Sequence, residues 1–134
     1  ITISTRIGLE EKKSSIIVFL AHWCSHCQRE VPMIQKFIDS SGLPQNINIF
    51  SVATHIDKTR NNYPPDEWLE REKYTVPTIF DDEENKIAES FGLNAFPYWV
   101  FLNPDGTVYM RHAGSLSEDQ FNQVMTAGSN YEIK

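Results

Sequence analysis

The sequence has few of the features that mark specialised classes of protein. Only two cysteines occur in its 134 residues, and they lie three positions apart at Cys24 and Cys27. A structural disulfide framework needs pairs that close long loops, so this pair does not hold the fold together. No stretch approaches the roughly 18 consecutive apolar residues that a membrane helix needs. The longest apolar run, at residues 16–21, has the length of a strand.

Positive charge is also scarce. The chain carries 12 Lys and Arg against 18 Asp and Glu, which gives a net charge of −6, and no cluster of Lys and Arg forms a stripe. Nucleic acids and anionic membranes are therefore poor candidates as partners. The chain opens at Ile1 without Met or a signal peptide. We expect a leader or anchor to have been removed, so that any membrane attachment would come through that lost segment.

The remaining composition is that of an ordinary globular protein, with 40% apolar and 22% charged residues. A chain of this length can bury a core without staples, and it shows no repeat, low-complexity tract or linker. We predict a single domain over residues 1–134 and a monomer.

Hydrophobic periodicity divides the chain into alternating strands and helices. Residues 1–7 alternate weakly and are ambiguous, whereas residues 15–20 form a β-branched run typical of a buried central strand. Helical spacing begins at Ser25 and ends near Gly42, and Asp66 is expected to cap a short second helix. Further strands are predicted at 47–53, 76–80, 96–102 and 107–112, and further helices after Asp82 and from Ser117. The order indicates an α/β fold, with a mixed central sheet flanked by helices on both faces and a hairpin at one edge. Residues 59–65 form a polar loop that matches no motif.

The two cysteines lie where a buried strand passes into a helix, in Trp23-Cys24-Ser25-His26-Cys27. A thiolate at a helix start is stabilised by the positive end of the helix dipole and by free N–H groups. Cys24 gains most from this position and stays accessible, whereas Cys27 lies one turn further in and is shielded. We therefore expect Cys24 to exchange with substrate and Cys27 to resolve the mixed disulfide.

The residues between the cysteines tune their chemistry. A protonated His26 could favour the Cys24 thiolate, which would stabilise the reduced form and raise the reduction potential. Ser25-His26 looks more oxidising than the Gly-Pro of thioredoxin, but two residues do not fix the direction.

Other uses of the cysteine pair can be compared. A c-type haem site needs His after the second Cys, and Gln28 stands there. A structural zinc site needs four ligands, and no second Cys pair exists, although His22 and His26 could supply nitrogens. Two inert core cysteines remain open as a further alternative.

Together with the residues around them, the cysteines resemble the thioredoxin superfamily, and within it the TlpA/ResA-like extracytoplasmic thiol–disulfide oxidoreductases. The resemblance runs from about Ser15 to Gly128. It rests on the segments at residues 19–32 and 91–97 and on the Asn-Pro-Asp-Gly turn at 103–106. It implies a thioredoxin-like fold and disulfide exchange with protein thiols and a redox partner protein, with no cofactor beyond the dithiol.

The resemblance also assigns residues outside the cysteine motif. It implies a cis peptide at Phe96-Pro97, facing the cysteines, with the neighbouring backbone free to pair with a substrate chain. Bulky Phe96 is expected to narrow the substrate groove, and Trp23 to shape the surface beside it. A trans proline that merely starts an edge strand is the alternative.

The position of an acidic residue near the cysteines distinguishes TlpA/ResA-like proteins from thioredoxin. Glu30 matches the acid that TlpA/ResA-like proteins place three positions after the second cysteine, and it shares a helix face with Cys27. It could relay the proton of Cys27, or it could be an ordinary solvated glutamate. Thioredoxin keeps an aspartate where this chain has Val18, a departure that argues against a cytosolic thioredoxin and leaves Glu30 as the only nearby acid.

The sequence therefore predicts an extracytoplasmic thiol–disulfide oxidoreductase, with reduction favoured over oxidation but not settled. The alternative is a metal-handling or binding module of the same fold without turnover. Copper chaperones of this fold resemble a Cys-x-x-x-Cys pattern, and peroxidases centre on one Cys flanked by Thr and Arg; neither pattern occurs here. We interpret His22, His55 and His112 as surface or satisfied histidines. Of Tyr98 and Trp99, one is expected in the core and the other at the groove.

Overall fold

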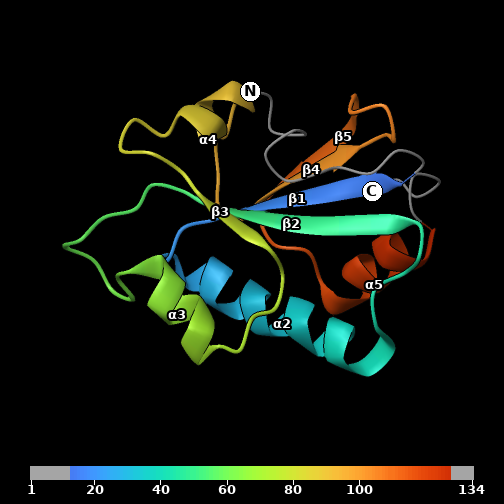
Figure 1. Cartoon of the computed structure of the whole chain (residues 1–134), viewed down its shortest axis with the longest axis horizontal. Coiled ribbons are helices and arrows are strands. Elements are labelled where there is room, and N and C mark those ends of the chain that lie inside the picture. The colour runs from blue at the N-terminus through green and yellow to red at the C-terminus, as the bar shows by residue number, and fades with distance from the viewer. Residues whose placement is uncertain (1–12, 128–134) are drawn as a thin grey trace.

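A computed structural model describes residues 13–127 and shows a central sheet of five strands (Figure 1). The strands lie in the order β3-β2-β1-β4-β5. Their bounds are Ser14–Leu20 for β1, Ile47–Ala53 for β2, Thr78–Phe80 for β3, Tyr98–Leu102 for β4 and Val108–Ala113 for β5. The weakly alternating segment at residues 1–7 lies outside the described part of the chain.

Two kinds of pairing meet at the central strand β1. It runs parallel to β2, and β2 runs parallel to β3. On its other side β1 is antiparallel to β4, which forms the predicted hairpin with β5. Because β1 and β4 run in opposite directions, the C-terminal end of β1 and the N-terminal end of β4 lie at the same end of the sheet, with Phe19 paired to Tyr98. This end of the sheet carries the cysteines.

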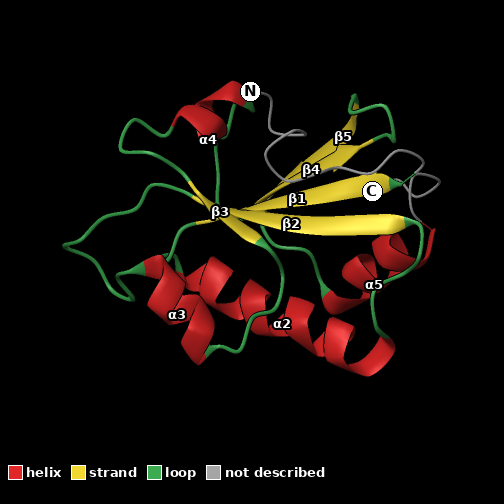
Figure 2. Ribbon diagram, in the orientation of Figure 1, coloured by secondary structure: helices red, strands yellow, loops and turns green. Residues whose placement is uncertain are grey.

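Helices cover both faces of the sheet, as Figure 2 shows. One face packs against α2 (Ser25–Ser41), α3 (Pro65–Arg71) and α5 (Glu118–Ala127), and the other against α4 (Lys86–Ser90). The predicted α/β fold with a mixed sheet between helices is confirmed. Every residue of β4 is buried, because side chains pointing to either face meet a helical layer.

Alternation along β1 and β4 sends side chains into two cores. The larger core, between the sheet and helices α2 and α5, receives Trp99 and Phe101. Tyr98 and Val100 enter the smaller core, between the sheet and α4. Tyr98 is 6% exposed and Trp99 is fully buried. The expectation that one of these two borders a substrate groove is therefore wrong, since a sheet covered on both faces leaves no solvated side.

Three elements begin two residues away from their predicted starts, each next to a proline. Helix α3 begins at Pro65, and no side chain caps it, so Asp66 lies in its first turn instead of capping it. Proline suits the first helical position because its missing N–H would be unpaired there anyway. Strands β3 and β4 each begin two residues later than predicted, at Thr78 and Tyr98. Pro77 and Pro97 precede them and cannot donate to a strand ladder.

Candidate functional site

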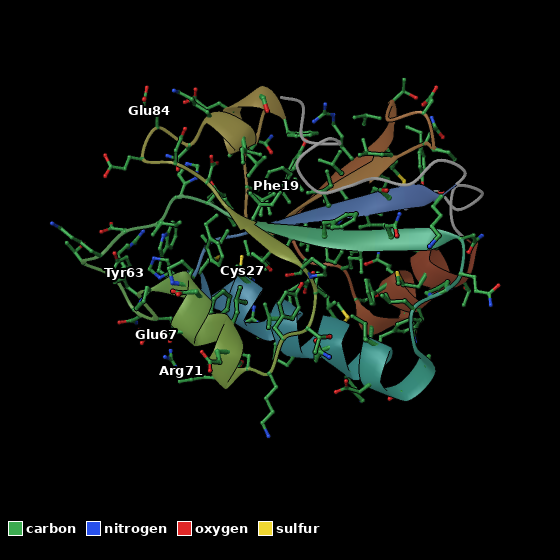
Figure 3. The ribbon with its side chains drawn as sticks, viewed as in Figure 1. Phe19, Cys27, Tyr63, Glu67, Arg71 and Glu84 are labelled. Atoms are coloured by element: carbon green, nitrogen blue, oxygen red, sulfur yellow. The ribbon has the colours of Figure 1, made fainter. Side chains whose placement is uncertain are left out.

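The cysteine pair lies at the junction of β1 and α2, and its two thiols differ in exposure. Cys24 is the N-cap residue of α2, with extended backbone, and is half-buried, whereas Cys27 is fully buried. Figure 3 shows Cys27 at the start of α2, on the side of the sheet opposite Phe19. Both cysteines are free thiols in this structure.

The surroundings of Cys27 disfavour its thiolate. Burial raises its pKa far above the ordinary range, and the charges of Cys24 and Glu30 raise it further. One contact acts in the opposite direction, because the backbone N–H of Ala21 donates to the Cys27 sulfur at 3.4 Å. Cys27 is thus a protonated thiol in the reduced protein, and it must lose a proton before it can attack.

Glu30 is 3% exposed, on the same face of α2 as Cys27 and one turn further along. Its carboxylate oxygen accepts a hydrogen bond of 2.7 Å from the backbone N–H of Leu116, in the connection before α5. Burial raises the pKa of Glu30 to about 7, although the Leu116 N–H and the nearby Trp99 indole lower it. The interpretation of Glu30 as a solvated helix residue is wrong.

Phe96 and Pro97 bring a distant segment to the cysteines. The Phe96-Pro97 peptide is cis, as the sequence resemblance implied. The carbonyl oxygen of Phe96 lies 3.9 Å from the Cys24 sulfur, across 72 residues of sequence. Pro97 is buried, and the Phe96 ring packs edge-on against Trp23 with ring centroids 5.9 Å apart.

His26 and Ser25 are exposed in the first turn of α2. The guanidinium of Arg29 lies 2.7 Å from Nδ1 of His26. Arginine can only donate, so Nδ1 of His26 is the acceptor in this contact. That a protonated His26 favours the Cys24 thiolate stays a prediction, and Arg29 adds a positive charge beside it.

A buried polar group behind the cysteines was missed by sequence reasoning. The hydroxyls of Tyr74 and Ser51 lie 2.6 Å apart, and the nearby charges of Glu30 and Cys27, together with burial, raise the pKa of Tyr74. Ser51 is the strand partner of Val18. A serine among the apolar residues 49–53 was the only signal in the sequence for this group.

The three remaining histidines all have partners. His22 is 1% exposed, with its two nitrogens bonded to backbone groups of Asn61 and Asp57. His55 lies against the Phe96 ring, and His112 lies 3.2 Å from the Ser115 carbonyl oxygen. The interpretation of these histidines as surface or satisfied residues agrees with these contacts. Within residues 13–127 no group of three His, Cys, Asp or Glu side chains is placed to hold a metal ion.

The model of the thioredoxin-like domain matches residues 5–129 of this sequence. The chain belongs to the thioredoxin-like family. Its distant curated relatives are thiol–disulfide oxidoreductases. Sporulation thiol-disulfide oxidoreductase A of Bacillus subtilis is 20% identical over 83% of this chain and 66% of its own length. ResA of Halalkalibacterium halodurans is 22% identical over 86% of this chain and 62% of its own length. The chain therefore spans just under two thirds of the length of these two curated relatives.

Solved structures agree with this thioredoxin-like fold. StoA from Bacillus subtilis superposes with a TM-score of 0.72 and 19% identity, covering 85% of this chain and 83% of that one. A secreted Mycobacterium tuberculosis disulfide oxidoreductase superposes with a TM-score of 0.71 and 18% identity, covering 90% of this chain and 85% of that one. An exposed lipoprotein thioredoxin of Streptococcus pneumoniae superposes with a TM-score of 0.68 and 21% identity, covering 87% of this chain and 85% of that one. No helix within residues 13–127 is both long and apolar enough to cross a membrane.

Proposed function

We propose that this protein exchanges disulfides with protein substrates, with Cys24 as the nucleophile and Cys27 as the resolving thiol. The observation that carries the proposal is the asymmetry of the pair, since Cys24 is half-exposed at the N-cap while Cys27 is buried one turn inside. Disulfide exchange needs one thiol that meets the substrate and a second that is kept from it. The curated relatives, themselves thiol–disulfide oxidoreductases, support the same chemistry.

The reaction consumes the dithiol and one substrate disulfide. The Cys24 thiolate attacks a substrate sulfur, which breaks the substrate S–S bond, forms a mixed disulfide and releases one substrate thiol. Cys27 then gives up its proton and attacks the Cys24 sulfur, which releases the second substrate thiol. Two electrons have passed to the substrate, and the protein holds a Cys24–Cys27 disulfide. A dithiol partner protein must reduce this disulfide before the next cycle.

Glu30 is proposed as the acceptor of the Cys27 proton. With a pKa of about 7, its carboxyl group is partly ionised near neutral pH, so it can both take up and release a proton there. It lies on the face of α2 that carries Cys27, and it is buried with it. No other acid is buried on that helix.

Phe96 and Pro97 are proposed to bind the substrate chain. The Phe96 carbonyl is close to the Cys24 sulfur, and Pro97 offers no N–H of its own. An extended substrate backbone can therefore lie beside residues 95–97 with its sulfur at Cys24. Trp23, Ser25 and His26 border this region and are proposed to modulate the reaction.

We favour the reducing direction and an extracytoplasmic location. Burial and the charges of Cys24 and Glu30 disfavour a thiolate at Cys27, so the reduced form gains no stabilisation from a thiolate there. That stabilisation makes a dithiol oxidising, so its absence favours a reductase. Secreted and lipoprotein relatives of the same fold support the location. Nothing in the site favours the alternative of a metal-handling module.

The decisive experiment measures insulin-disulfide reduction by the wild type and three variants. Cys24→Ser should abolish it, because the attacking sulfur is lost. Cys27→Ala should retain the first attack and accumulate a mixed disulfide with a substrate peptide, detectable by mass spectrometry. Ser40→Ala, which changes an exposed hydroxyl near the other end of α2, should retain most activity. Unchanged reduction in Cys24→Ser would disprove the proposal.

The direction has a test of its own. The equilibrium constant with glutathione gives the reduction potential, and we expect a value near that of thioredoxin, about −270 mV. A value near that of the bacterial oxidase, about −120 mV, would establish disulfide formation instead.

A further inference from the structure

The ring of Trp23, the residue immediately before Cys24, is held by three groups. Its indole N–H donates to the carbonyl oxygen of His55 at 2.9 Å. The ring of Phe96 packs against it edge-on. The guanidinium of Arg60 lies over the ring face, with its carbon 3.9 Å from the ring centroid. Arg60 therefore lies against the side chain that adjoins the proposed nucleophile.

The segment that carries Arg60 is fixed to the cysteine motif. Residues 54–64 connect β2 to α3, and the buried His22 imidazole bonds this connection twice, at 2.6 Å to the Asn61 carbonyl oxygen and at 3.1 Å to the Asp57 N–H. The Asp57 carbonyl in turn accepts from the Arg60 N–H at 3.1 Å. His22 and Trp23 are adjacent, so the loop is anchored to the strand that leads into Cys24.

The Arg60 side chain keeps its hydrogen-bonding capacity. It is exposed, and among residues 13–127 it forms no ion pair with an acidic side chain. Stacking on an aromatic ring uses the face of the guanidinium plane and leaves its N–H groups pointing outward at the edge. Such an edge matches the two oxygens of a carboxylate.

Because the chain is acidic overall, the Arg60 cation can distinguish substrates by their charge. At a net charge of −6 the molecule as a whole repels acidic partners. A carboxylate on a substrate is favoured only near a cation, and Arg60 places one beside the cysteine motif. Hydrogen bonds from the Thr59 hydroxyl and backbone N–H, and the nearby charge of Arg60, lower the pKa of Asp57, the acid of this loop, but Asp57 and Arg60 form no ion pair.

We propose that Arg60 is a specificity-determining residue that binds a carboxylate next to the reacting cysteine of an acidic peptide or protein substrate. The inference rests on the proposed function, since it names the substrate class of that same site. Arg60 takes no part in the electron or proton transfers. It selects the disulfide that reaches Cys24.

Three peptides test this inference, each with one intramolecular disulfide and with Glu, Gln or Lys beside the cysteine that is attacked. The second-order rate constant for oxidation of the reduced protein is measured at low ionic strength. Wild type should react with the Glu peptide about fivefold faster than with the Gln peptide, the size expected for an exposed ion pair, and slowest with the Lys peptide. High salt should reduce the preference.

Variants assign the preference to one side chain. Arg60→Gln should bring the Glu and Gln peptides to equal rates, and Arg60→Lys should keep part of the difference. Lys58→Gln removes the same charge from an exposed position of the same loop and should leave the preference unchanged. Equal slowing of all three peptides by Arg60→Gln would show that Arg60 only positions Trp23, and would overturn the inference.

Two further outcomes separate the inference from the proposed function. Equal rates of wild type with the Glu and Gln peptides would overturn the inference and leave disulfide exchange intact. No reaction of wild type with any peptide would overturn the proposed function, and the inference with it.

Discussion

Glu30 keeps a carboxyl group where water hardly reaches it, and this makes the stability of the reduced protein depend on pH. Its pKa rises from an ordinary 4.5 to about 7 on folding, mainly through burial. Between these two values the unfolded chain has already lost the proton that the folded chain still holds. The protonated Glu30 carboxyl group therefore makes its full contribution to folding stability below pH 4.5, and this contribution is lost as the pH rises to about 7.

Glu30→Gln should remove this dependence, because the amide does not ionise and can still accept from the Leu116 N–H. Relative to the variant, the reduced wild type should lose up to about 3 kcal/mol of unfolding free energy between pH 4 and pH 8. Urea unfolding at both pH values measures the difference. Glu89→Gln, at an exposed position of α4, provides the matched control and should follow the wild type. Parallel profiles for the wild type and Glu30→Gln would contradict the assigned pKa.

At the scale of one element, α4 depends on a carboxylate that lies outside it. Asp81 is 7% exposed and accepts hydrogen bonds of 3.0 Å from the N–H groups of both Ile87 and Ala88. It also accepts 2.8 Å from the Thr54 hydroxyl, at the end of β2. Ile87 and Ala88 lie in the first turn of α4, where N–H groups have no partner inside the helix, so Asp81 supplies the missing acceptor.

Asp81→Ala should therefore cost about 3 kcal/mol of unfolding free energy, the size expected when bonds to a charged acceptor are lost and buried donors stay unpaired. Hydrogen exchange at Ile87 and Ala88 should increase more than at α2. Asp66→Ala, in the exposed first turn of α3, should change stability by less than about 0.5 kcal/mol. Similar losses in both variants would show that Asp81 has no special role.

Most elements could be predicted from the sequence because their signals are local. The β-branched run of β1 and the apolar spacing of α2 do not depend on distant residues. The start of α3 was placed wrongly because Asp66 is a common cap, whereas the structure uses the proline pair before it. Burial of Glu30 could not be derived, since it depends on Leu116, a residue 86 positions away. The Tyr74–Ser51 contact was hidden for the same reason.

For the molecule as a whole, the larger core joins the sheet to α5 and so supports the site. Phe121 is fully buried, with its ring 5.4 Å from Phe37 and 5.7 Å from Trp99. These contacts connect α5 with α2 and β4. The same packing keeps Leu116, just before α5, within hydrogen-bond distance of Glu30.

Phe121→Ala should cost about 3–5 kcal/mol, because it leaves a cavity among three elements. The variant should also weaken the bond between Leu116 and Glu30, which would appear as faster hydrogen exchange at the Leu116 amide. Thermal unfolding and exchange measurements test both effects. Phe80→Ala, at a ring 42% exposed on edge strand β3, is the control and should cost little. A small loss for Phe121→Ala would show that α5 contributes little to the core.

The antiparallel pairing of β1 with β4 also determines the order in which the site is completed during synthesis. The thiol of Cys24 is made 72 residues before the Phe96 carbonyl that it meets in the finished fold. At 5–20 residues per second this interval is roughly 4 to 14 s. During that interval β4 has not been made, so the cysteine motif lacks the Phe96 carbonyl. The site is therefore completed only when the second half of the domain has been synthesised.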